Sequence, residues 1–379
     1  MTETLRPVLG PIELFGHTLP NRLAVAPMSR VSATDGGLAT DTMREYYAQF
    51  ARGGFAVVIT EGTYTDVEAS QGYDRQPGIA NDRQAASWTP VATAITAAGG
   101  MPILQLMHAG ALSQRRGTDQ TLAPSAIRPR GEMMPEYGGS GPYQLPAAMT
   151  VDDLGKVRDG FVRAAARARR AGFHGVEIHA ANGYLLDQFI TDYTNLRDDG
   201  YGGSASERVR YPAEIVSAVR ESSPSEFIVG VRVSEAKVND FEYRWPGGAV
   251  DATTIFRALA DAGAGYIHVA GEGRGFRESL DGDRETLTTL ARRVTGLPVI
   301  ANGGLHDPEL ADRVIDGGHA DIISIGRAAI ATPDWPLRIA NRKPVVPFSR
   351  EMISPIATIR QTQHWFRNLS AREACEGVV

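Results

Sequence analysis

Short apolar segments alternate with longer amphipathic segments along most of the chain. The short segments are rich in β-branched residues and carry few charges, which is typical of buried strands. They predict eight strands, at Leu23–Ala26, Phe55–Thr60, Ile103–Met107, Gly175–His179, Ile228–Val233, Tyr266–Val269, Val299–Ala301 and Ile322–Ile325. Because these segments show no polar face, they indicate a parallel sheet that is covered on both faces.

The amphipathic segments carry apolar residues at helical spacing. They predict helices at Asp41–Ala51, 82–98, Asp152–Arg170, 206–221, 252–262, 285–294 and 308–316, with further helical residues near 327–341. Thr40 is suited to cap the first helix and Gly172 to end the third. Eight strand–helix units favour an α/β fold of the closed (β/α)8 type over an open, doubly wound sheet. The Rossmann fingerprint typical of the open sheet is incomplete, because Gly271-Glu-Gly273-Arg-Gly275 lacks its final glycine.

The extra length over a barrel of roughly 250 residues lies in a few segments. Residues 11–20 predict a hairpin that closes the barrel bottom. Residues 108–150, 234–250 and 271–284 follow strands, so these long loops belong on the C-terminal face, where barrel active sites lie. We therefore expect one domain over residues 1–379, with the barrel at about 22–341 and a C-terminal tail at 342–379.

Composition narrows the possible partners. A hydrophobic content of 42% excludes a disordered chain, and a net charge of −5 gives no sign of nucleic-acid binding. The chain shows neither a signal peptide nor an apolar run long enough to span a membrane, so we expect a cytoplasmic location and no membrane partner. The single cysteine, Cys375, excludes an intramolecular disulfide, a thiolate zinc cluster and a four-cysteine iron–sulfur cluster.

In a barrel, the residues at the strand ends form a ring around one pocket. Here the ring is polar but has no clustered carboxylates, no paired metal-binding histidines and no lysine at a predicted strand end. Metal-dependent hydrolysis and Schiff-base chemistry are therefore weakly supported. The ring consists of Pro27-Met28-Ser29, Glu61-Gly62, Gln105-x-Met107-His108, His179-x-x-Asn182-x-Tyr184, Arg232, Gly303-Gly304 and Gly326-Arg327.

Two loops at the ring predict a phosphate site. Gly303 and Gly304 follow the seventh predicted strand, while Gly326 and Arg327 follow the eighth. Glycines let backbone N–H groups approach an anion closely, and loops seven and eight often hold phosphate in barrels. Paired glycines alone also occur in ordinary tight turns, but two such loops together with an arginine favour phosphate binding.

The stretch from His179 to Tyr184 predicts a catalytic site. His179 ends a strand, and Asn182 follows closely enough to aim a second hydrogen-bond donor at the same substrate oxygen. Two donors on one carbonyl stabilise the negative charge that develops there. Tyr184 supplies a hydroxyl that could give a proton to a neighbouring carbon.

With these motifs the sequence resembles the Old Yellow Enzyme family of FMN-dependent ene-reductases. The resemblance runs from about Leu14 to Trp335. The segments that carry it are LFGHTLPNRLAVAPMS, VVITEGT, LQLMHAG, GVEIHAANGYLLDQF, DYTNLRDDGYGGSASERVRY, VGVRVS, IANGG and IGRAAIATPDW. The family implies a single (β/α)8 barrel with FMN in its mouth.

The resemblance assigns cofactor roles to residues of the ring. Pro27, Met28 and Ser29 would lie against the flavin, with the Ser29 hydroxyl near O4, where the family usually has Thr or Cys. The remaining assignments place Gly62 where it leaves room for the ring, Gln105 at the pyrimidine edge, Arg232 near N1 and O2, and the phosphate at Gly303, Gly304, Gly326 and Arg327.

The resemblance also implies a ping-pong reaction with NAD(P)H as hydride donor. Its substrates would be α,β-unsaturated carbonyl or nitro compounds: enones, maleimides, nitroalkenes or nitrate esters. His179 and Asn182 would bind the substrate oxygen, flavin N5 would deliver hydride, and Tyr184 would protonate the product. Tyr73, Met107 and Phe276 are predicted pocket-wall residues, and Met107 replaces a residue that is often aromatic.

Several alternatives stay open at this point. His108 could contact the flavin or bind a backbone group, and the motif His364-Trp365-Phe366 in the tail could cap a neighbouring subunit of a homodimer or pack on the barrel. An enoyl- or dienoyl-CoA reductase, an FMN-dependent hydroxy-acid oxidase and a catalytically idle flavin- or phosphate-binding barrel are the alternative functions. The intact set of His179, Asn182 and Tyr184 favours the ene-reductase.

Overall fold

The computed structural model describes residues 5–118, 120–271, 275–276 and 285–376. Within them, eight parallel strands form a closed barrel in the order β4–β3–β13–β12–β11–β10–β9–β6, and pairing of β4 with β6 closes the sheet. The (β/α)8 prediction is thereby confirmed, and the open-sheet alternative is wrong. The barrel strands are β3 (Leu23–Val25), β4 (Val57–Ile59), β6 (Met101–Met107), β9 (Gly175–Asn182), β10 (Ile228–Lys237), β11 (Tyr266–Ala270), β12 (Val299–Asn302) and β13 (Ile322–Ile325).

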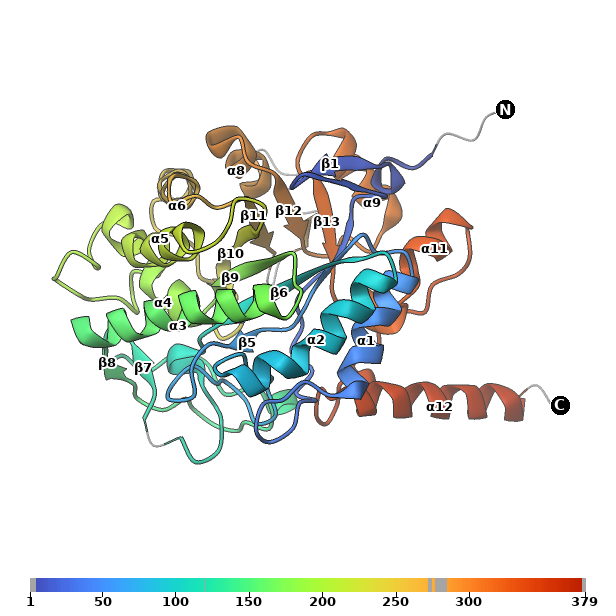
Figure 1. The fold of residues 1–379 in the computed structure, drawn as a ribbon, viewed down its shortest axis with the longest axis horizontal. Coiled ribbons are helices and arrows are strands. Elements are labelled where there is room, and N and C mark those ends of the chain that lie inside the picture. Colours follow the sequence, from blue (N-terminus) through green and yellow to red (C-terminus); the bar gives the residue numbers. More distant parts are fainter. Residues whose placement is uncertain (1–4, 119, 272–274, 277–284, 377–379) are drawn as a thin grey trace.

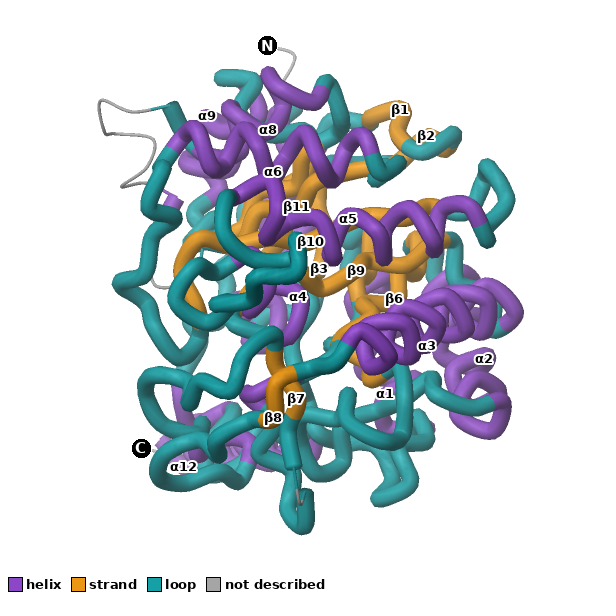
Figure 2. Tube along the Cα trace, turned by 90° about the vertical axis from the view of Figure 1, so that its left-hand side faces the viewer, coloured by secondary structure: helices purple, strands orange, loops and turns teal. Residues whose placement is uncertain are grey.

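The main helices lie around the barrel, as Figures 1 and 2 show. The Thr40 hydroxyl accepts a hydrogen bond of 3.3 Å from the Met43 N–H, which confirms the predicted cap of α1. Gly172 follows the end of α3 with a φ of 93°, a conformation that favours glycine. The helices are α1 (Asp41–Arg52), α2 (Asp82–Ala97), α3 (Val151–Arg170), α5 (Ala205–Glu221), α6 (Ala249–Asp261), α8 (Leu287–Thr295) and α9 (Pro308–Asp316).

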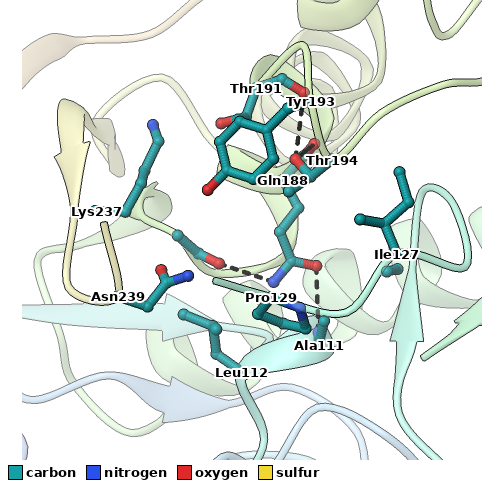
Figure 3. Close-up of a pocket in the computed structure, with 12 residues that line it drawn as sticks. Ala111, Leu112, Ile127, Pro129, Gln188, Thr191, Tyr193, Thr194, Lys237 and Asn239 are labelled. Atoms are coloured by element: carbon teal, nitrogen blue, oxygen red, sulfur yellow. Dashed lines mark hydrogen bonds between the residues drawn. The ribbon is translucent and has the colours of Figure 1, made fainter. Parts of the chain in front are cut away.

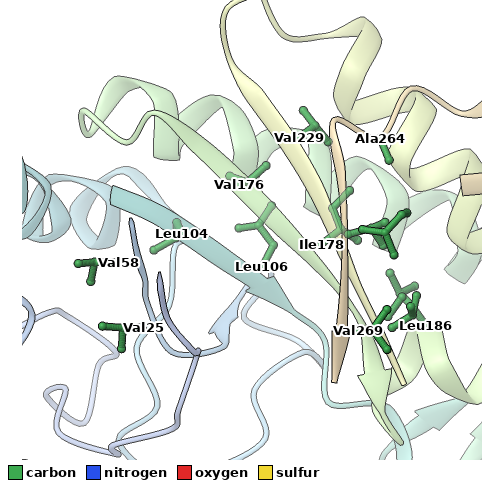
Figure 4. Close-up of a cluster of buried hydrophobic side chains, with 14 of the residues drawn as sticks. Val25, Val58, Leu104, Leu106, Val176, Ile178, Leu186, Val229, Ala264 and Val269 are labelled. Carbon is green, nitrogen blue, oxygen red and sulfur yellow. The ribbon is translucent and has the colours of Figure 1, made fainter. Parts of the chain in front are cut away.

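Side chains along each barrel strand point alternately outward and inward, and this alternation separates two apolar regions. Outward-facing residues such as Val58, Leu104 and Val176 pack against the helices in the main core, part of which Figure 4 shows. Inward-facing residues near the strand starts, such as Val57, Ile103 and Ile228, form a second cluster inside the barrel. The inward positions become polar toward the strand ends, so the barrel interior changes from apolar at the bottom to polar at the C-terminal face.

The N-terminal hairpin covers the apolar bottom of the barrel. Strands β1 (Ile12–Leu14) and β2 (His17–Leu19) pair antiparallel, as predicted for residues 11–20. Leu19 is buried in the inner cluster, and Ile12, Leu14 and Phe15 pack against it. The ring centroids of Phe15 and Tyr266 lie 5.4 Å apart. The hairpin therefore closes the end of the barrel opposite the strand ends.

The C-terminal face carries elements that the sequence pattern did not predict. A ninth strand of the described sheet, β5 (Thr63–Tyr64), pairs with β6, while β7 (Leu122–Ala123) and β8 (Ala147–Ala148) pair with each other inside the long loop 108–150. Helix α4 (Leu185–Ile190) follows β9 directly. Strand β10 runs to Lys237, beyond the predicted end at Val233. The expectation that no lysine stands at a strand end is therefore wrong.

Helices α10 (Arg327–Ala331) and α11 (Trp335–Ala340) follow β13, and the tail contains α12 (Ile359–Glu376), which Figure 1 shows running away from the barrel. The buried Arg30 guanidinium binds the Ala357 and Thr358 carbonyls at 3.1 and 2.9 Å. Trp365 and Phe366 pack against a cluster around Ile330 and Met352, and so contact their own chain. No helix in the described part of the chain has the length and hydropathy of a membrane span.

Candidate active site

Strand register brings the polar inward-facing residues together at the C-terminal half of the barrel. Arg232 on β10 pairs in register with His179 on β9 and with His268 on β11. Gln105 on β6 pairs with Glu177 on β9. Residues two apart on one strand face the same side, so Glu177 and His179 both point into the barrel at successive depths. These residues form two layers, one above the other.

The lower polar layer consists of Gln105, Glu177, Tyr266, His268 and Ser324, all of which are buried. Glu177 accepts hydrogen bonds from the Gln105 amide at 2.8 Å and the Tyr266 hydroxyl at 3.0 Å, and its Oε2 lies 2.8 Å from His268 Nδ1. His268 Nε2 lies 2.9 Å from the Ser324 hydroxyl. Every member of this layer thus has a partner inside the protein.

Charge in the lower layer follows from these contacts. Burial acts to raise the pKa of Glu177, but His268, Arg232 and Gln105 outweigh it, so the pKa lies below its ordinary value. Burial lowers the pKa of His268, although Glu177 opposes the shift. The pair is best described as an ionised carboxylate that accepts a hydrogen bond from a neutral imidazole.

The upper polar layer consists of His179, Asn182, Tyr184 and Arg232. Three of its buried polar atoms have no hydrogen-bond partner in the described part of the chain: His179 Nδ1, Asn182 Oδ1 and Arg232 Nε. Most buried polar atoms in proteins are hydrogen-bonded, so a concentration of unpaired ones points to a ligand-binding site. Burial, followed by Arg232 and His268, lowers the pKa of His179 well below its ordinary value, so its imidazole is neutral.

The turn that follows β9 places Asn182 and Tyr184. Asn182 has a φ of 67° and Gly183 a φ of 85°, so the chain reverses sharply between the strand and α4. The Asn182 N–H donates to the Ser234 hydroxyl at 2.8 Å. The rings of His179 and Tyr184 have their centroids 5.0 Å apart, and the Tyr184 hydroxyl is hydrogen-bonded to that of Tyr73. The three predicted catalytic residues therefore lie together.

The predicted phosphate loops are neighbours as well. Gly303 and Gly304 have φ values of 127° and 71°, which side-chain-bearing residues rarely adopt. Gly326 and the exposed Arg327 follow β13, whose register with β12 sets Ser324 beside Asn302. The two loops therefore extend from adjacent strand ends and combine open backbone with a cation, as a phosphate requires.

The predicted flavin-ring residues lie at the same face. Pro27 is buried, Met28 and Ser29 are half-buried, and a Cβ on Gly326 would lie 3.4 Å from Met28 Sδ. A Cβ on Gly62 would overlap Met107 Sδ, so in this structure Met107 uses the space that Gly62 leaves. The unpaired Nε of Arg232 and the backbone N–H groups of the glycine loops are donors of the kind that an FMN ring and its phosphate need.

The predicted pocket-wall residues are buried. Tyr73 and Met107 pack in one cluster with Tyr184, and the rings of Tyr73 and Tyr137 have their centroids 4.4 Å apart. Phe276 is 7% exposed, and its N–H donates to the Gly303 carbonyl at 2.8 Å. His108 Nδ1 accepts a hydrogen bond from the Gly110 N–H at 3.1 Å, which is the backbone-binding role left open above.

A second buried carboxylate lies next to the ring. Glu61 follows β4 and accepts hydrogen bonds from the Arg30 N–H at 2.8 Å and the Tyr47 hydroxyl at 3.0 Å. Burial raises the pKa of Glu61 to about 7. Sequence reasoning named this residue only as part of the ring and assigned it no role.

Of the lower layer, the sequence predicted only Gln105 and missed Glu177, Tyr266, His268 and Ser324. The signal was present as polar residues at alternate positions of predicted buried strands: Glu177 before His179, and Tyr266 before His268. A residue that breaks an apolar strand on one face points into the barrel, and several such strands imply a network. The register that joins them is visible only in the fold.

Known proteins support the assignment of this barrel to a flavin-binding class. The model of the NADH:flavin oxidoreductase / NADH oxidase family matches residues 7–345. Chanoclavine-I aldehyde reductase of Penicillium roqueforti is 34% identical over 360 residues, covering 90% of each chain. The solved Old Yellow Enzyme homologue of Zymomonas mobilis has a TM-score of 0.80 and 32% identity, covering 91% of this chain and 95% of that one.

NADH oxidase of Thermoanaerobacter brockii is 31% identical over 329 residues; the match covers 83% of this chain and 48% of that relative. The chain therefore belongs to the NADH:flavin oxidoreductase / NADH oxidase family, the family of Old Yellow Enzyme. It is an FMN-dependent oxidoreductase that uses a nicotinamide cofactor.

Proposed function

We propose that the protein reduces activated C=C bonds of α,β-unsaturated carbonyl and nitro compounds with NAD(P)H. The observation that carries the proposal is the upper polar layer, where the ring nitrogen His179 Nδ1 and the guanidinium nitrogen Arg232 Nε are buried without hydrogen-bond partners among the described residues. A donor pair, a phenol and a fixed cation around one space are what this reaction needs.

His179 and Asn182 bind the substrate oxygen. The imidazole is neutral and carries one N–H, and the Asn182 amide carries two. Hydrogen bonds to a carbonyl or nitro oxygen withdraw electrons from the conjugated double bond and stabilise the negative charge that forms during reduction. Both side chains are held in place by β9 and its turn, so they need little reorganisation on binding.

Tyr184 donates the proton to the carbon next to the activating group. Its hydroxyl is hydrogen-bonded to that of Tyr73, which is fully buried. Burial raises the pKa of Tyr73 well above its ordinary value, so Tyr73 stays protonated and can return a proton to Tyr184. A general acid placed in this way contributes a factor of roughly 10²–10⁴.

FMN, when bound, supplies the hydride that NAD(P)H provides and the substrate receives. Arg232 contributes a fixed cation for the negative charge of the reduced cofactor. Gly303, Gly304, Gly326 and Arg327 hold the phosphate, and Pro27, Met28, Ser29, Gly62 and Gln105 surround the ring.

Enones, maleimides, nitroalkenes and nitrate esters are the substrates to test. Met107 and Tyr73 pack with Tyr184 and line the substrate side. Phe276 packs in the main core beside Gly303 and borders the site from the side of the phosphate loops. Met107 has a flexible side chain, so the pocket can adapt to substrates of different width.

Anaerobic titration of the purified protein tests the proposal. We expect yellow protein whose flavin absorbance is bleached by NADPH or NADH and recovers on addition of 2-cyclohexenone, with cyclohexanone as product. Protein that carries no flavin would contradict the cofactor assignment. Flavin that is bleached but does not recover with any member of the substrate panel would contradict ene-reductase activity.

A further inference from the structure

A buried ion pair lies directly behind the turn that carries Asn182 and Tyr184. Lys237 at the end of β10 is 1% exposed, and its Nζ lies 2.6 Å from Oδ1 of Asp187, which is fully buried. The ammonium also donates to the Ser234 carbonyl at 3.3 Å and lies 4.8 Å from the centroid of the Tyr243 ring. Neither charged residue takes part in the chemistry proposed above.

The other carboxylate oxygen of Asp187 reaches the turn itself. The Gly183 N–H donates to Asp187 Oδ2 at 2.6 Å. Gly183 stands between Asn182 and Tyr184, so the hydrogen bond fixes the peptide unit that joins Asn182 to Gly183, one residue before Tyr184. The pair therefore forms a continuous connection from Lys237 through Asp187 to the Gly183 amide.

Further hydrogen bonds to the backbone, from the end of β10 and from α4, hold the same turn. Lys237 is in register with Asn182, and the Val238 N–H donates to the Asn182 carbonyl at 3.2 Å. The Gln188 amide donates to the Gly183 carbonyl at 2.8 Å, as the dashed line in Figure 3 shows. Figure 3 also shows Lys237 and Asn239 lining a small pocket behind the turn together with Gln188.

The turn has an uncommon backbone conformation that its surroundings help to fix. Asn182 has a left-handed φ of 67°, which asparagine adopts more readily than other non-glycine residues but which is still infrequent. A buried ion pair is seldom the most stable way to fill a core, because removing two charges from water costs several kcal/mol per ion. A pair that also holds a functional turn has a reason to be present that stability alone does not provide.

We propose that Asp187 and Lys237 are positioning residues for the reaction. Lys237 orients the Asp187 carboxylate, and that carboxylate holds the Gly183 amide so that Asn182 and Tyr184 point at the substrate. This inference rests on the roles proposed for Asn182 and Tyr184, but it also makes a prediction about the backbone that is independent of them.

Two matched double variants test the proposal. In Lys237→Met/Asp187→Asn both charges are removed, while the amide oxygen of the new residue can still accept the Gly183 hydrogen bond. In Lys237→Met/Asp187→Leu both charges and the acceptor are removed. Neither leaves an unpaired buried charge, so both avoid the main cause of unfolding that a single substitution would bring.

The expected difference is in the turn and in the oxidative half-reaction. The Leu variant should reduce 2-cyclohexenone at least tenfold more slowly than the Asn variant, which should stay within about threefold of the wild type. Hydrogen–deuterium exchange of the Gly183 amide should be about tenfold or more faster in the Leu variant than in the Asn variant. In a Tyr184→Phe background, the rate difference between the two variants should shrink.

Equal reaction rates together with equal Gly183 exchange in the two folded variants would overturn the proposal, because the acceptor would then be irrelevant. The proposal would also be overturned if the two variants differed in reaction rate but had equal exchange at the Gly183 amide, because the rate difference would then not come from the turn. If the wild type shows no ene-reductase activity, the proposed function fails, while the exchange comparison still tests whether Asp187 holds the turn.

Discussion

The two polar layers of the barrel are built from the same kinds of residue, yet they differ in how their polar atoms are used. In the lower layer, Glu177 has three partners, and both ring nitrogens of His268 are engaged. In the upper layer, buried atoms of His179, Asn182 and Arg232 have no hydrogen-bond partner among the described residues. Burial therefore does not distinguish these two layers, whereas hydrogen-bond satisfaction does.

The comparison also assigns separate tasks to the layers. Within the lower layer, Glu177 holds Gln105 in place and provides negative charge near Arg232. The lower layer therefore supports the upper layer without contacting substrate. The upper layer keeps its hydrogen-bonding capacity for ligands. Substitutions in the lower layer should therefore act mainly on stability, and substitutions in the upper layer mainly on chemistry.

The largest expected effect comes from Tyr184→Phe in the upper layer. This change removes the proton donor and keeps the ring, so reoxidation of the reduced enzyme by an enone should slow by roughly 10²–10⁴-fold. Reduction of the flavin by NADPH should change less than about threefold, because it needs no proton from Tyr184. Stopped-flow measurement of each half-reaction checks this, and an equal loss in both would show that Tyr184 has another role.

The next largest effect separates the layers by stability. Glu177→Gln replaces the buried carboxylate that binds Gln105, Tyr266 and His268 with a neutral amide. Losing a charged acceptor from such a buried network typically costs about 1.5–3 kcal/mol in free energy of unfolding. His179→Gln should cost less than about 1 kcal/mol, because no protein hydrogen bond to its Nδ1 is lost. Urea unfolding at a fixed excess of FMN measures both, and similar losses would remove the distinction between the layers.

The buried carboxylates of Glu61 and Glu177 should change the stability of the protein in opposite directions as pH rises, because the pKa of Glu61 is raised and that of Glu177 is lowered. The pKa of Glu61 is raised from its ordinary 4.5 to about 7, so between these pH values the folded protein binds a proton that the unfolded chain releases. The wild type therefore loses stability as pH rises through this window.

Glu61→Gln has no such titration and resembles the protonated form. Between pH 4 and pH 8, the free energy of unfolding of Glu61→Gln should rise relative to that of the wild type by about 3 kcal/mol, at about 1.4 kcal/mol per pKa unit. For Glu177, whose pKa is lowered, stability should instead be lost as pH falls below the ordinary value. A pH-independent difference between Glu61→Gln and the wild type would contradict the raised pKa.

Much of the fold and part of the site could be predicted from the sequence. The eight buried strands follow from local apolar runs, and the ring residues follow because parallel strands end on one face. His179, Asn182 and Tyr184 were found because they lie within six residues of each other, so that one strand and its turn bring them together.

What escaped prediction depends on contacts between distant segments. Lys237 meets Asp187 only because β10 continues through an irregular register after Val233. Glu177, His268 and Ser324 come from three different strands, and only their register shows that they meet. The place of Met107 beside Gly62 depends on side-chain packing that no sequence pattern encodes.

A crystal structure of the FMN-bound protein with a saturated cyclic ketone, which offers no C=C bond to reduce, tests the central claim most directly. We predict that the ketone oxygen lies about 2.7–3.2 Å from the side-chain nitrogens of His179 and Asn182, with Arg232 Nε bonded to FMN. A ketone bound elsewhere, with the polar atoms of the upper layer still unpaired beside bound FMN, would contradict the claim that this layer is the active site.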